Sequence, residues 1–294
     1  MKPSSYSTGL KQARTFSPEL FQSWLKGEAR PEGTIPILRT QDVHKPPRVI
    51  PPILQTTQLN KRNAFVHRKN DNHEYARVSI HQVANYYGAH ALFNVWTPRV
   101  HDEREFDERE FSLSQVVHLW FQVRHLDHEA RLFIYWTRDG YHRTGCYNLE
   151  CPGFVQTNNR FVIGGPIRPT SVYGGNHKSG NWWLRVQEQD IGYWPGSIFT
   201  SLAKKATLIN SGGEKQRARI HHTPTQMGSG HFAEEGFGKA CFMGQLGYFD
   251  NANMFRNPQN LTPTVTNPSC YDLVVGKGGK SFFFGGHGFS QKCS

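Results

Sequence analysis

The residues best suited to chemistry lie in the short segment Ser211-Gly212-Gly213-Glu214. Two glycines before a carboxylate let another backbone approach closely, so that a substrate chain has room to lie against the acid group. On local sequence alone, the simpler interpretation is a glycine-rich turn with an exposed glutamate. A Gly-x-Ser-x-Gly elbow, a Walker loop and a His-Glu-x-x-His motif are all absent from the chain.

Three histidines, His221, His222 and His231, lie close together in the sequence. On a strand, His221 and His222 would point to opposite faces, which makes them a poor chelating pair. They lack the set of carboxylate or cysteine partners at ligand spacing that a zinc site needs. We therefore expect hydrogen-bonded surface or core histidines, and we predict neither a metal site nor a cofactor.

The five cysteines suggest disulfides rather than zinc ligands. Cys146 and Cys151 are spaced to close a tight loop, whereas Cys270 and Cys293 bracket the last apolar segments. A zinc site would usually need a second close pair. Cys241 lies in an apolar run and is expected to be a buried thiol.

Two bridges favour an oxidising compartment, which is the compartment of secreted proteins. Asn260-Leu261-Thr262 is a glycosylation sequon and agrees with that location. The first residues carry no apolar stretch of a signal peptide, which points the other way. We give the cysteines more weight and expect a secreted protein.

The net charge of +11 is concentrated at one end of the chain. Residues 1–70 hold 12 Lys and Arg against 4 Asp and Glu, whereas the remaining residues hold 22 against 19. The simplest interpretation is a solvated basic tail, and the alternative is a tail that binds an acidic polymer. A nucleic-acid-binding globular body is not indicated.

The composition changes near residue 70. The preceding residues are rich in Lys, Arg, Pro and Gln, which predicts an extended arm with one short helix between Ser17 and Gly27. Glycine-punctuated aromatic and β-branched segments follow, which predicts an all-β domain over residues 71–294. A second short helix is expected from Ser197 to Ala203. No apolar run is long enough to cross a membrane.

The expected strands are eight short segments: Tyr75–Ile80, Ala91–Trp96, Arg131–Trp136, Phe154–Thr157, Trp182–Val186, Gly238–Met243, Tyr271–Val275 and Ser281–Phe284. A charged tandem repeat, Glu103-Arg104-Glu105-Phe106 followed by Glu108-Arg109-Glu110-Phe111, interrupts this pattern. The simplest expectation for a run with this many charged residues is a solvated loop or the edge of a sheet.

Many longer motifs resemble the neprosin family in order and spacing, from about Tyr75 to Gly288. They are Asn94-Val95-Trp96-x-Pro98, Phe111-Ser112-Leu113-Ser114-Gln115, Arg131-Leu132-Phe133-x-Tyr135-Trp136-Thr137-x-Asp139-Gly140-Tyr141, Thr144-Gly145-Cys146-Tyr147-Asn148-Leu149, Cys151-Pro152-Gly153-Phe154-Val155-Gln156, Gly180-Asn181-Trp182-Trp183-Leu184, Gly192-Tyr193-Trp194-Pro195, Gly212-Gly213-Glu214, Thr225-Gln226-Met227-Gly228-Ser229-Gly230-His231-Phe232 and Glu235-Gly236-Phe237-Gly238-Lys239-Ala240. Residues 31–37 resemble the end of the family's activation peptide, so residues 1–70 are expected to be its remnant and a proline-rich linker.

This resemblance implies a secreted plant protein with a two-layer antiparallel β-sandwich. It also implies a glutamic peptidase that cleaves after proline at acidic pH, with two glutamates and no cofactor or metal. Glu214 matches the second glutamate. The cysteine pairs Cys146/Cys151 and Cys270/Cys293 match the family's disulfides.

The chain departs from the family at the first glutamate. An Ile-Glu-Ala-Gly-Trp-type motif should precede a Trp-Gln-Val, but Val116–Leu119 lead directly into Trp120-Phe121-Gln122-Val123. The equivalent position is empty or holds an apolar residue such as Val117. The segment between Tyr173 and Gly180 is also short, and Arg30 replaces a cysteine. Glu110, Asp127 and Glu129 are the nearest acids, but none has the right context.

Two functions follow from this departure. The first is an impaired glutamic endopeptidase that acts on proline-containing peptides or proteins through Glu214. The second is a catalytically silent secreted sandwich that binds proline-rich peptides or cell-wall polymers. Its binding residues would be Trp182, Trp183, Tyr193 and Trp194, although at least half of these are expected to be core. The sequence does not indicate the oligomeric state.

Overall fold

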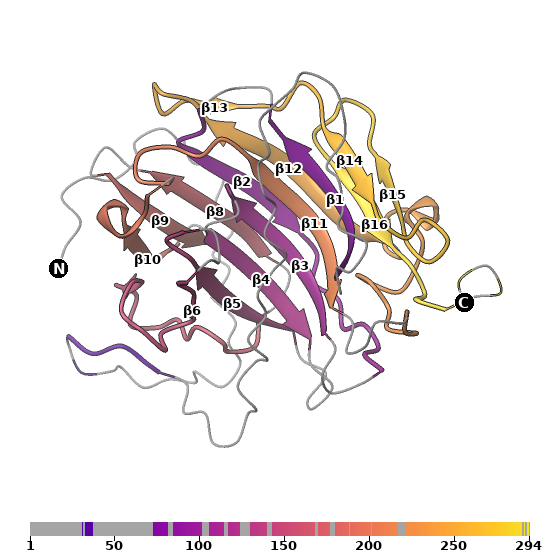
Figure 1. Cartoon of the computed structure of the whole chain (residues 1–294), viewed down its shortest axis with the longest axis horizontal. Helices are drawn as coiled ribbons and strands as arrows, with labels where there is room; N and C mark the ends of the chain where they lie inside the picture. The colour runs from indigo at the N-terminus through magenta and orange to yellow at the C-terminus, as the bar shows by residue number, and fades with distance from the viewer. Residues whose placement is uncertain are drawn as a thin grey trace.

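The protein folds into two stacked antiparallel β-sheets, which confirms the predicted two-layer all-β sandwich (Figure 1). The computed structural model describes residues 31, 33–37, 73–81, 85–101, 106–114, 117–123, 130–139, 143–167, 170–176, 180–187, 189–200, 202–216, 222–289, 291 and 293. The helix expected between Ser17 and Gly27 lies outside these residues, as does most of the predicted N-terminal arm. No described helix is long and apolar enough to cross a membrane.

The first sheet has seven strands in the order β14-β1-β11-β3-β4-β5-β6. Their bounds are β1 His73–Ile80, β3 Phe106–Leu113, β4 Val117–Val123, β5 Ala130–Trp136, β6 Cys146–Tyr147, β11 Ile209–Gln216 and β14 Thr262–Val265. All of its neighbours pair antiparallel, so residues 73–80 and 209–216 lie side by side although they are far apart in the sequence.

The second sheet has nine strands, eight of them in the order β15-β16-β12-β2-β8-β9-β10-β7, and β13 pairs with β12. Their bounds are β2 Gly88–Phe93, β7 Val155–Gln156, β8 Thr170–Asn176, β9 Asn181–Val186, β10 Gln189–Pro195, β12 Cys241–Phe249, β13 Phe255–Arg256, β15 Asp272–Val275 and β16 Phe282–Gly285. All eight predicted strands therefore have a counterpart, with shifted ends.

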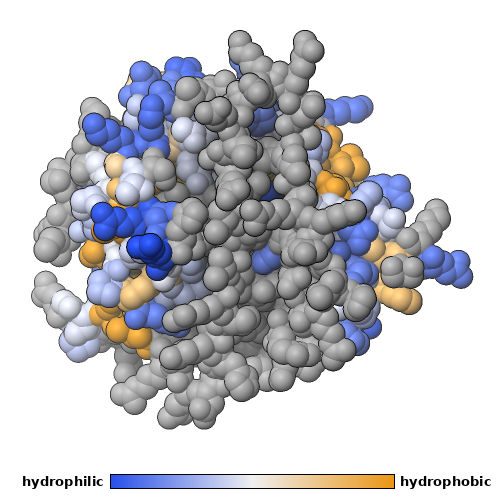
Figure 2. All heavy atoms as spheres, viewed as in Figure 1, coloured by the Kyte–Doolittle hydropathy of each residue, from blue (hydrophilic) through white to orange (hydrophobic). Residues whose placement is uncertain are grey.

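The hydrophobic core lies between the two sheets. Large fully buried side chains such as Trp182, Trp194, Phe282 and Phe284 form it together with Val78 and Ile80 of the first sheet. Burial of aromatic side chains of this size contributes most of the stabilisation in a sandwich core. Figure 2 shows hydrophilic and hydrophobic residues interspersed at the left and right edges of the molecule, where the described surface is visible.

Three local predictions were wrong. The second half of the charged repeat, residues 108–111, is neither a loop nor an edge, because β3 lies inside the sheet between β11 and β4. The glycine-rich segment before Glu214 is not a turn but the middle of β11. The helix expected from Ser197 is only the short 3-10 helix η1, Gly196–Ile198, because Phe199 is already extended (φ −98°, ψ 155°). For the two strands, pairing with neighbouring strands outweighs local propensity.

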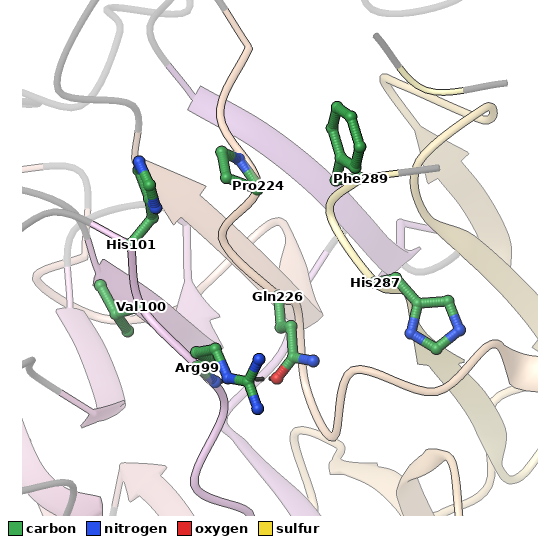
Figure 3. Close-up of a pocket in the computed structure, with 7 residues that line it drawn as sticks. All are labelled: Arg99, Val100, His101, Pro224, Gln226, His287 and Phe289. Carbon is green, nitrogen blue, oxygen red and sulfur yellow. Dashed lines mark hydrogen bonds between the residues drawn. The ribbon is translucent and has the colours of Figure 1, made fainter. Parts of the chain in front are cut away.

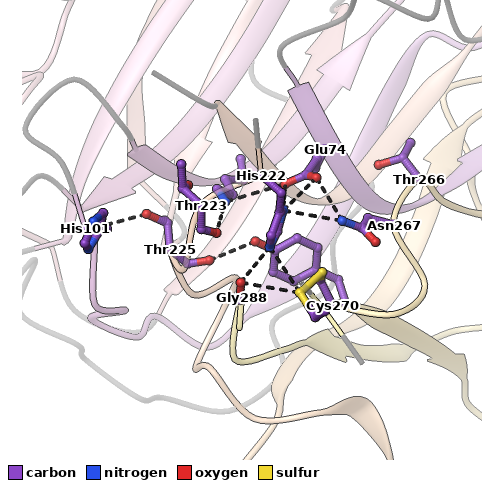
Figure 4. Close-up of polar contacts among 12 residues, drawn as sticks. Glu74, His101, His222, Thr223, Thr225, Thr266, Asn267, Cys270 and Gly288 are labelled. Atoms are coloured by element: carbon purple, nitrogen blue, oxygen red, sulfur yellow. Dashed lines mark hydrogen bonds and ion pairs between the residues drawn. A yellow bond between two sulfur atoms is a disulfide. The ribbon is translucent and has the colours of Figure 1, made fainter. Parts of the chain in front are cut away.

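The predicted disulfides are confirmed. Cys146 bonds to Cys151 and Cys270 bonds to Cys293, with Cα–Cα distances of 6.0 and 5.0 Å. Cys241 is a buried thiol that forms no disulfide, as expected. The second bridge fixes the C-terminal tail beside β1 and the segment that follows β11 (Figure 4).

Candidate functional site

Glu214 lies in the middle of β11, on the face that points away from the second sheet. The adjacent Gly213 defines the other face, because a Cβ there would lie 2.6 Å from the Phe284 ring and 2.8 Å from the Met227 sulfur. Successive residues on a strand alternate between faces, so Glu214 points outward. It is nevertheless buried, which was not expected from a glycine-rich turn.

The two glycines have a steric role at this position. A Cβ on Gly212 would collide with the Ala76 carbonyl oxygen and with Arg77 of β1. Glycine therefore allows β1 and β11 to pair closely beside the carboxylate. The Gly-Gly-Glu segment places an acid on a strand whose neighbours are fixed on both sides.

The carboxylate of Glu214 contacts an imidazole. Nδ1 of His73 lies 2.6 Å from Oε1 of Glu214, and the two side chains are only 4% and 5% exposed. This is the distance of a charge-assisted hydrogen bond, in which the ring N–H donates to the carboxylate. Two titratable groups thus share one buried position.

Aromatic stacking fixes the imidazole in place. The His73 ring lies almost parallel to the Tyr75 ring, with an interplanar angle of 14° and centroids 6.1 Å apart. The Arg77 guanidinium lies 4.2 Å from the centroid of Tyr75. These three alternate residues of β1 share the outward face with Glu214, because Tyr75 pairs directly with Glu214.

A second glutamate stands opposite Glu214 in the register of β11 and β3. The Cα partner of Glu214 is Glu108, and the next residue in this row, on β4, is Gln122. Glu108, which belongs to the charged repeat, is therefore the Cα partner of Glu214 on the neighbouring strand. Glu110, one of the acids considered from the sequence, pairs instead with Gly212. Glu108 was not considered.

Val117, the residue near which the first glutamate was expected from the sequence, does not lie beside Glu214. It pairs with Leu113, which in turn pairs with Ile209, five positions along β11 from Glu214. At about 3.4 Å per residue, the two rows are roughly 17 Å apart. Val117 is 3% exposed and belongs to the core, so this position offers Glu214 no partner.

A buried ionic cluster occupies the opposite face of the same two strands (Figure 4). The Lys215 ammonium lies 3.5 Å from the Glu74 carboxylate and donates to the Thr223 carbonyl at 2.7 Å. Nδ1 of His222 lies 3.0 Å from the same carboxylate. Glu74 also accepts a hydrogen bond from Asn267 at 3.0 Å.

These contacts set the charge of Glu74. Burial by itself raises the pKa of the Glu74 carboxyl. The His222 hydrogen bond, the Lys215 charge and the Asn267 hydrogen bond outweigh burial and lower this pKa to about 2. Glu74 is therefore an ionised structural group at ordinary pH, and it lies on the face away from Glu214.

The same cluster contains a potential set of metal ligands. Ligand atoms of His222, Cys270 and Cys293 all lie within 4.8 Å of one another. The two sulfurs are joined in a disulfide, so they offer no thiolate to an ion while the bridge is closed. His222 is hydrogen-bonded, as expected, whereas His221 lies outside the described residues. The ring of His231 contacts Glu235 at 2.9 Å.

The four predicted aromatic binding residues lie on β9 and β10 of the second sheet, not beside Glu214. Trp182 and Trp194 are core residues, and the Trp182 indole donates to the Leu202 carbonyl at 2.7 Å. The rings of Trp183 and Tyr193 lie 4.8 Å apart. The sequon residue Asn260 is exposed in the loop before β14.

A separate cavity of about 600 Å³ opens between the segments around Val100, Gln226 and His287 (Figure 3). Its walls are joined by a hydrogen bond from the Arg99 backbone N–H to the Gln226 side-chain oxygen at 2.8 Å. Glu214 is not among its lining residues, which are Arg99, Val100, His101, Pro224, Gln226, His287 and Phe289.

Glu214 was a candidate from the sequence, whereas His73, Glu74, Lys215 and Glu108 were not considered. His73 lies two residues before Tyr75, where the predicted strand begins. If that strand is extended by two residues, His73 points to the same face as Tyr75. No sequence signal gives the register between β1 and β11, because the two strands are far apart in the chain.

Comparison with known proteins gives the following matches. The Neprosin family model matches residues 110–287, a stretch that includes Glu214 but not His73. A crystal structure of scytalido-glutamic peptidase with a peptide-based transition-state analogue is 8% identical, with a TM-score of 0.42 over 73% of this chain and 98% of that chain. SCP-B, a member of the eqolisin family of peptidases in complex with the tripeptide Ala-Ile-His, is 7% identical, with a TM-score of 0.41 over 74% and 98%.

CG-16, a homodimeric agglutinin from chicken liver, is 11% identical, with a TM-score of 0.28 over 48% of this chain and 96% of that chain. The family match covers well over half of the 294 residues and spans strands of both sheets, from β3 to β16. This chain belongs to the neprosin family.

Proposed function

We propose that this domain is a glutamic-peptidase-type hydrolase of peptides, centred on Glu214 and much slower than an intact family member. The observation that carries the proposal is the buried Glu214 carboxylate, held on an outward strand face beside a second titratable group. A carboxylate in this position is suited to activate water as a general base. Membership in the neprosin family supports peptides as the substrate. It also supports cleavage after proline, and acidic pH as the condition.

The low rate follows from the loss of the first glutamate. Val117 is a core residue in a distant row, so it supplies neither an acid nor a base to the site. Paired groups in an active site act as a unit, and removing one of them eliminates most of the rate. Residues 1–70 would be the remnant of the activation peptide, and the two disulfides fit a secreted protein.

The alternative is a silent module that binds proline-rich peptides or cell-wall polymers. The observation in its favour is that Val117, the residue near which the first glutamate was expected from the sequence, is an apolar core residue. Partners of either kind are proteins or polymers of the extracellular space, rather than nucleic acid or membrane.

A peptide-library digest tests the proposal. The purified chain and Glu214→Gln are incubated with a proteome-derived library from about pH 2 to about pH 7, and the new termini are mapped by mass spectrometry. We expect slow cleavage after proline, faster in acid, that disappears in Glu214→Gln. Cleavage at other residues would refute the specificity. Calorimetric binding of a prolyl peptide by both proteins, without cleavage by either, would favour the silent module.

A further inference from the structure

We propose that His73 is the second proton-handling residue of the Glu214 site and supplies the acid that the lost glutamate would have provided. This inference rests on the proposed peptidase function and names a further catalytic residue for it. Its basis is the contact between Nδ1 of His73 and Oε1 of Glu214 at 2.6 Å, with both side chains almost fully buried. His73 lies before the stretch that matches the family model.

The geometry defines the pair. His73 is opposite Gln216 and Tyr75 is opposite Glu214, so the imidazole reaches diagonally across the two strands to the carboxylate. Stacking on Tyr75 holds the ring in this direction. Among the described residues, this is the titratable side chain seen in contact with the Glu214 carboxylate.

The chemistry requires two groups in opposite protonation states. The carboxylate of Glu214 takes a proton from water as the water oxygen forms a bond to the peptide carbonyl carbon. The imidazolium of His73 gives a proton to the amide nitrogen as the C–N bond breaks. Proton transfer from Glu214 back to His73 restores both groups, so the net reaction is peptide plus water giving a carboxylic acid and an amine.

The pair on the other face shows why proximity alone is not enough. His222 also contacts a glutamate, Glu74, but that carboxylate is held ionised by Lys215 and Asn267 as well. Glu74 points toward the second sheet and is bound on several sides by charged and polar groups of the protein. The outward pair of His73 and Glu214 differs because it lies on the face that points away from the second sheet.

The test compares two leaving groups. A peptidyl-prolyl anilide needs a proton on its leaving nitrogen, whereas the matching p-nitrophenyl ester releases an anion that needs none. We expect His73→Gln to lower kcat/KM for the anilide by about 10²–10⁴-fold and to affect the ester far less. Free imidazole should restore part of the anilide activity of His73→Ala.

Two matched controls accompany these variants. His231→Gln removes another histidine that contacts a glutamate, at 2.9 Å from Glu235 and 44% exposed, and should leave both substrates unaffected. Glu108→Gln removes the acid at the register position opposite Glu214. Loss of anilide activity in Glu108→Gln with full activity in His73→Gln would assign the role to Glu108 and overturn the inference.

The outcomes separate the two claims. If Glu214→Gln is inactive but folded His73→Gln cleaves the anilide like the wild type, the peptidase function stands and the role of His73 is refuted. Equal loss of anilide and ester activity without imidazole rescue would mean that His73 only supports the structure, which also refutes it. If Glu214→Gln retains full activity, or the wild type cleaves neither substrate, the proposed function itself fails.

Discussion

Nδ1 of His73 on β1 and Oε1 of Glu214 on β11 lie 2.6 Å apart, although the residues are 141 positions apart in the sequence. The contact depends on the register of the two strands, in which Tyr75 stands directly opposite Glu214. A slip of one residue would move every side chain of β1 to the other face. The contact between His73 and Glu214 therefore depends on the pairing of β1 with β11.

Gly213→Ala should destabilise the fold, because a Cβ there would lie 2.6 Å from the Phe284 ring and 2.8 Å from the Met227 sulfur. We expect a loss of about 1–3 kcal/mol in the free energy of unfolding, measured by urea denaturation. Ser211→Ala is the matched control on the same strand face, because its buried hydroxyl has no hydrogen-bond partner among the described residues. Equal stability of the two variants would contradict the close packing at Gly213.

Val117→Glu should not increase activity, although the resemblance places the expected first glutamate near Val117 in sequence. Its side chain is in the core, where an unpaired carboxylate costs at least about 3 kcal/mol. We expect a large fall in melting temperature and no gain in peptide cleavage, whereas Val117→Leu should be tolerated. A stable Val117→Glu protein with increased prolyl cleavage would show that the register of β3 and β4 is wrong.

Glu74→Gln should destabilise the protein at neutral pH but not in strong acid. The pKa of Glu74 is about 2 in the folded protein, compared with 4.5 for an ordinary glutamate. Because the folded pKa is lowered, the contribution, about 3 kcal/mol, is complete above about pH 5 and is lost as the pH falls toward 2.

Unfolding free energies of the wild type and Glu74→Gln, measured across this pH range, should therefore converge in acid. Glu150→Gln changes an exposed glutamate and serves as the control. A difference between the wild type and Glu74→Gln that stayed constant with pH would rule out the stabilisation of this carboxylate by His222, Lys215 and Asn267.

The two disulfides should differ in their effect on stability. Cys270–Cys293 closes a longer loop than Cys146–Cys151, with sequence separations of 23 and 5. Loop entropy then predicts a loss of about 3 kcal/mol for the Cys270→Ser/Cys293→Ser variant and about 2 kcal/mol for Cys146→Ser/Cys151→Ser. Denaturant unfolding checks the order, and a greater loss in the second variant would contradict it.

The sequence was sufficient for the fold class, both disulfides and the strand that follows Asn181, because alternation, spacing and the family motifs are local signals. It was insufficient for β11, where Gly212 and Gly213 resemble a turn until their close contacts with β1 and the second sheet are known. The same holds for β3, whose charged repeat favours a loop.

Of the candidate site, only Glu214 could be predicted from the sequence. Glu214 is a candidate because of its Gly-Gly-Glu motif, whereas His73 lies outside the matched stretch and reaches Glu214 only through the pairing of β1 with β11. Glu108 likewise depends on the register of β3. Long-range register is decided by the whole core, so a single sequence does not reveal it.

The most direct test of the account is kcat/KM for a proline-containing fluorogenic peptide, measured for the folded wild type and for Glu214→Gln at acidic pH. Circular dichroism and melting temperature establish that both proteins have the same fold. The account predicts slow cleavage by the wild type and a fall of about 10²-fold or more in Glu214→Gln. Cleavage at the same rate by both proteins would contradict a catalytic role for Glu214.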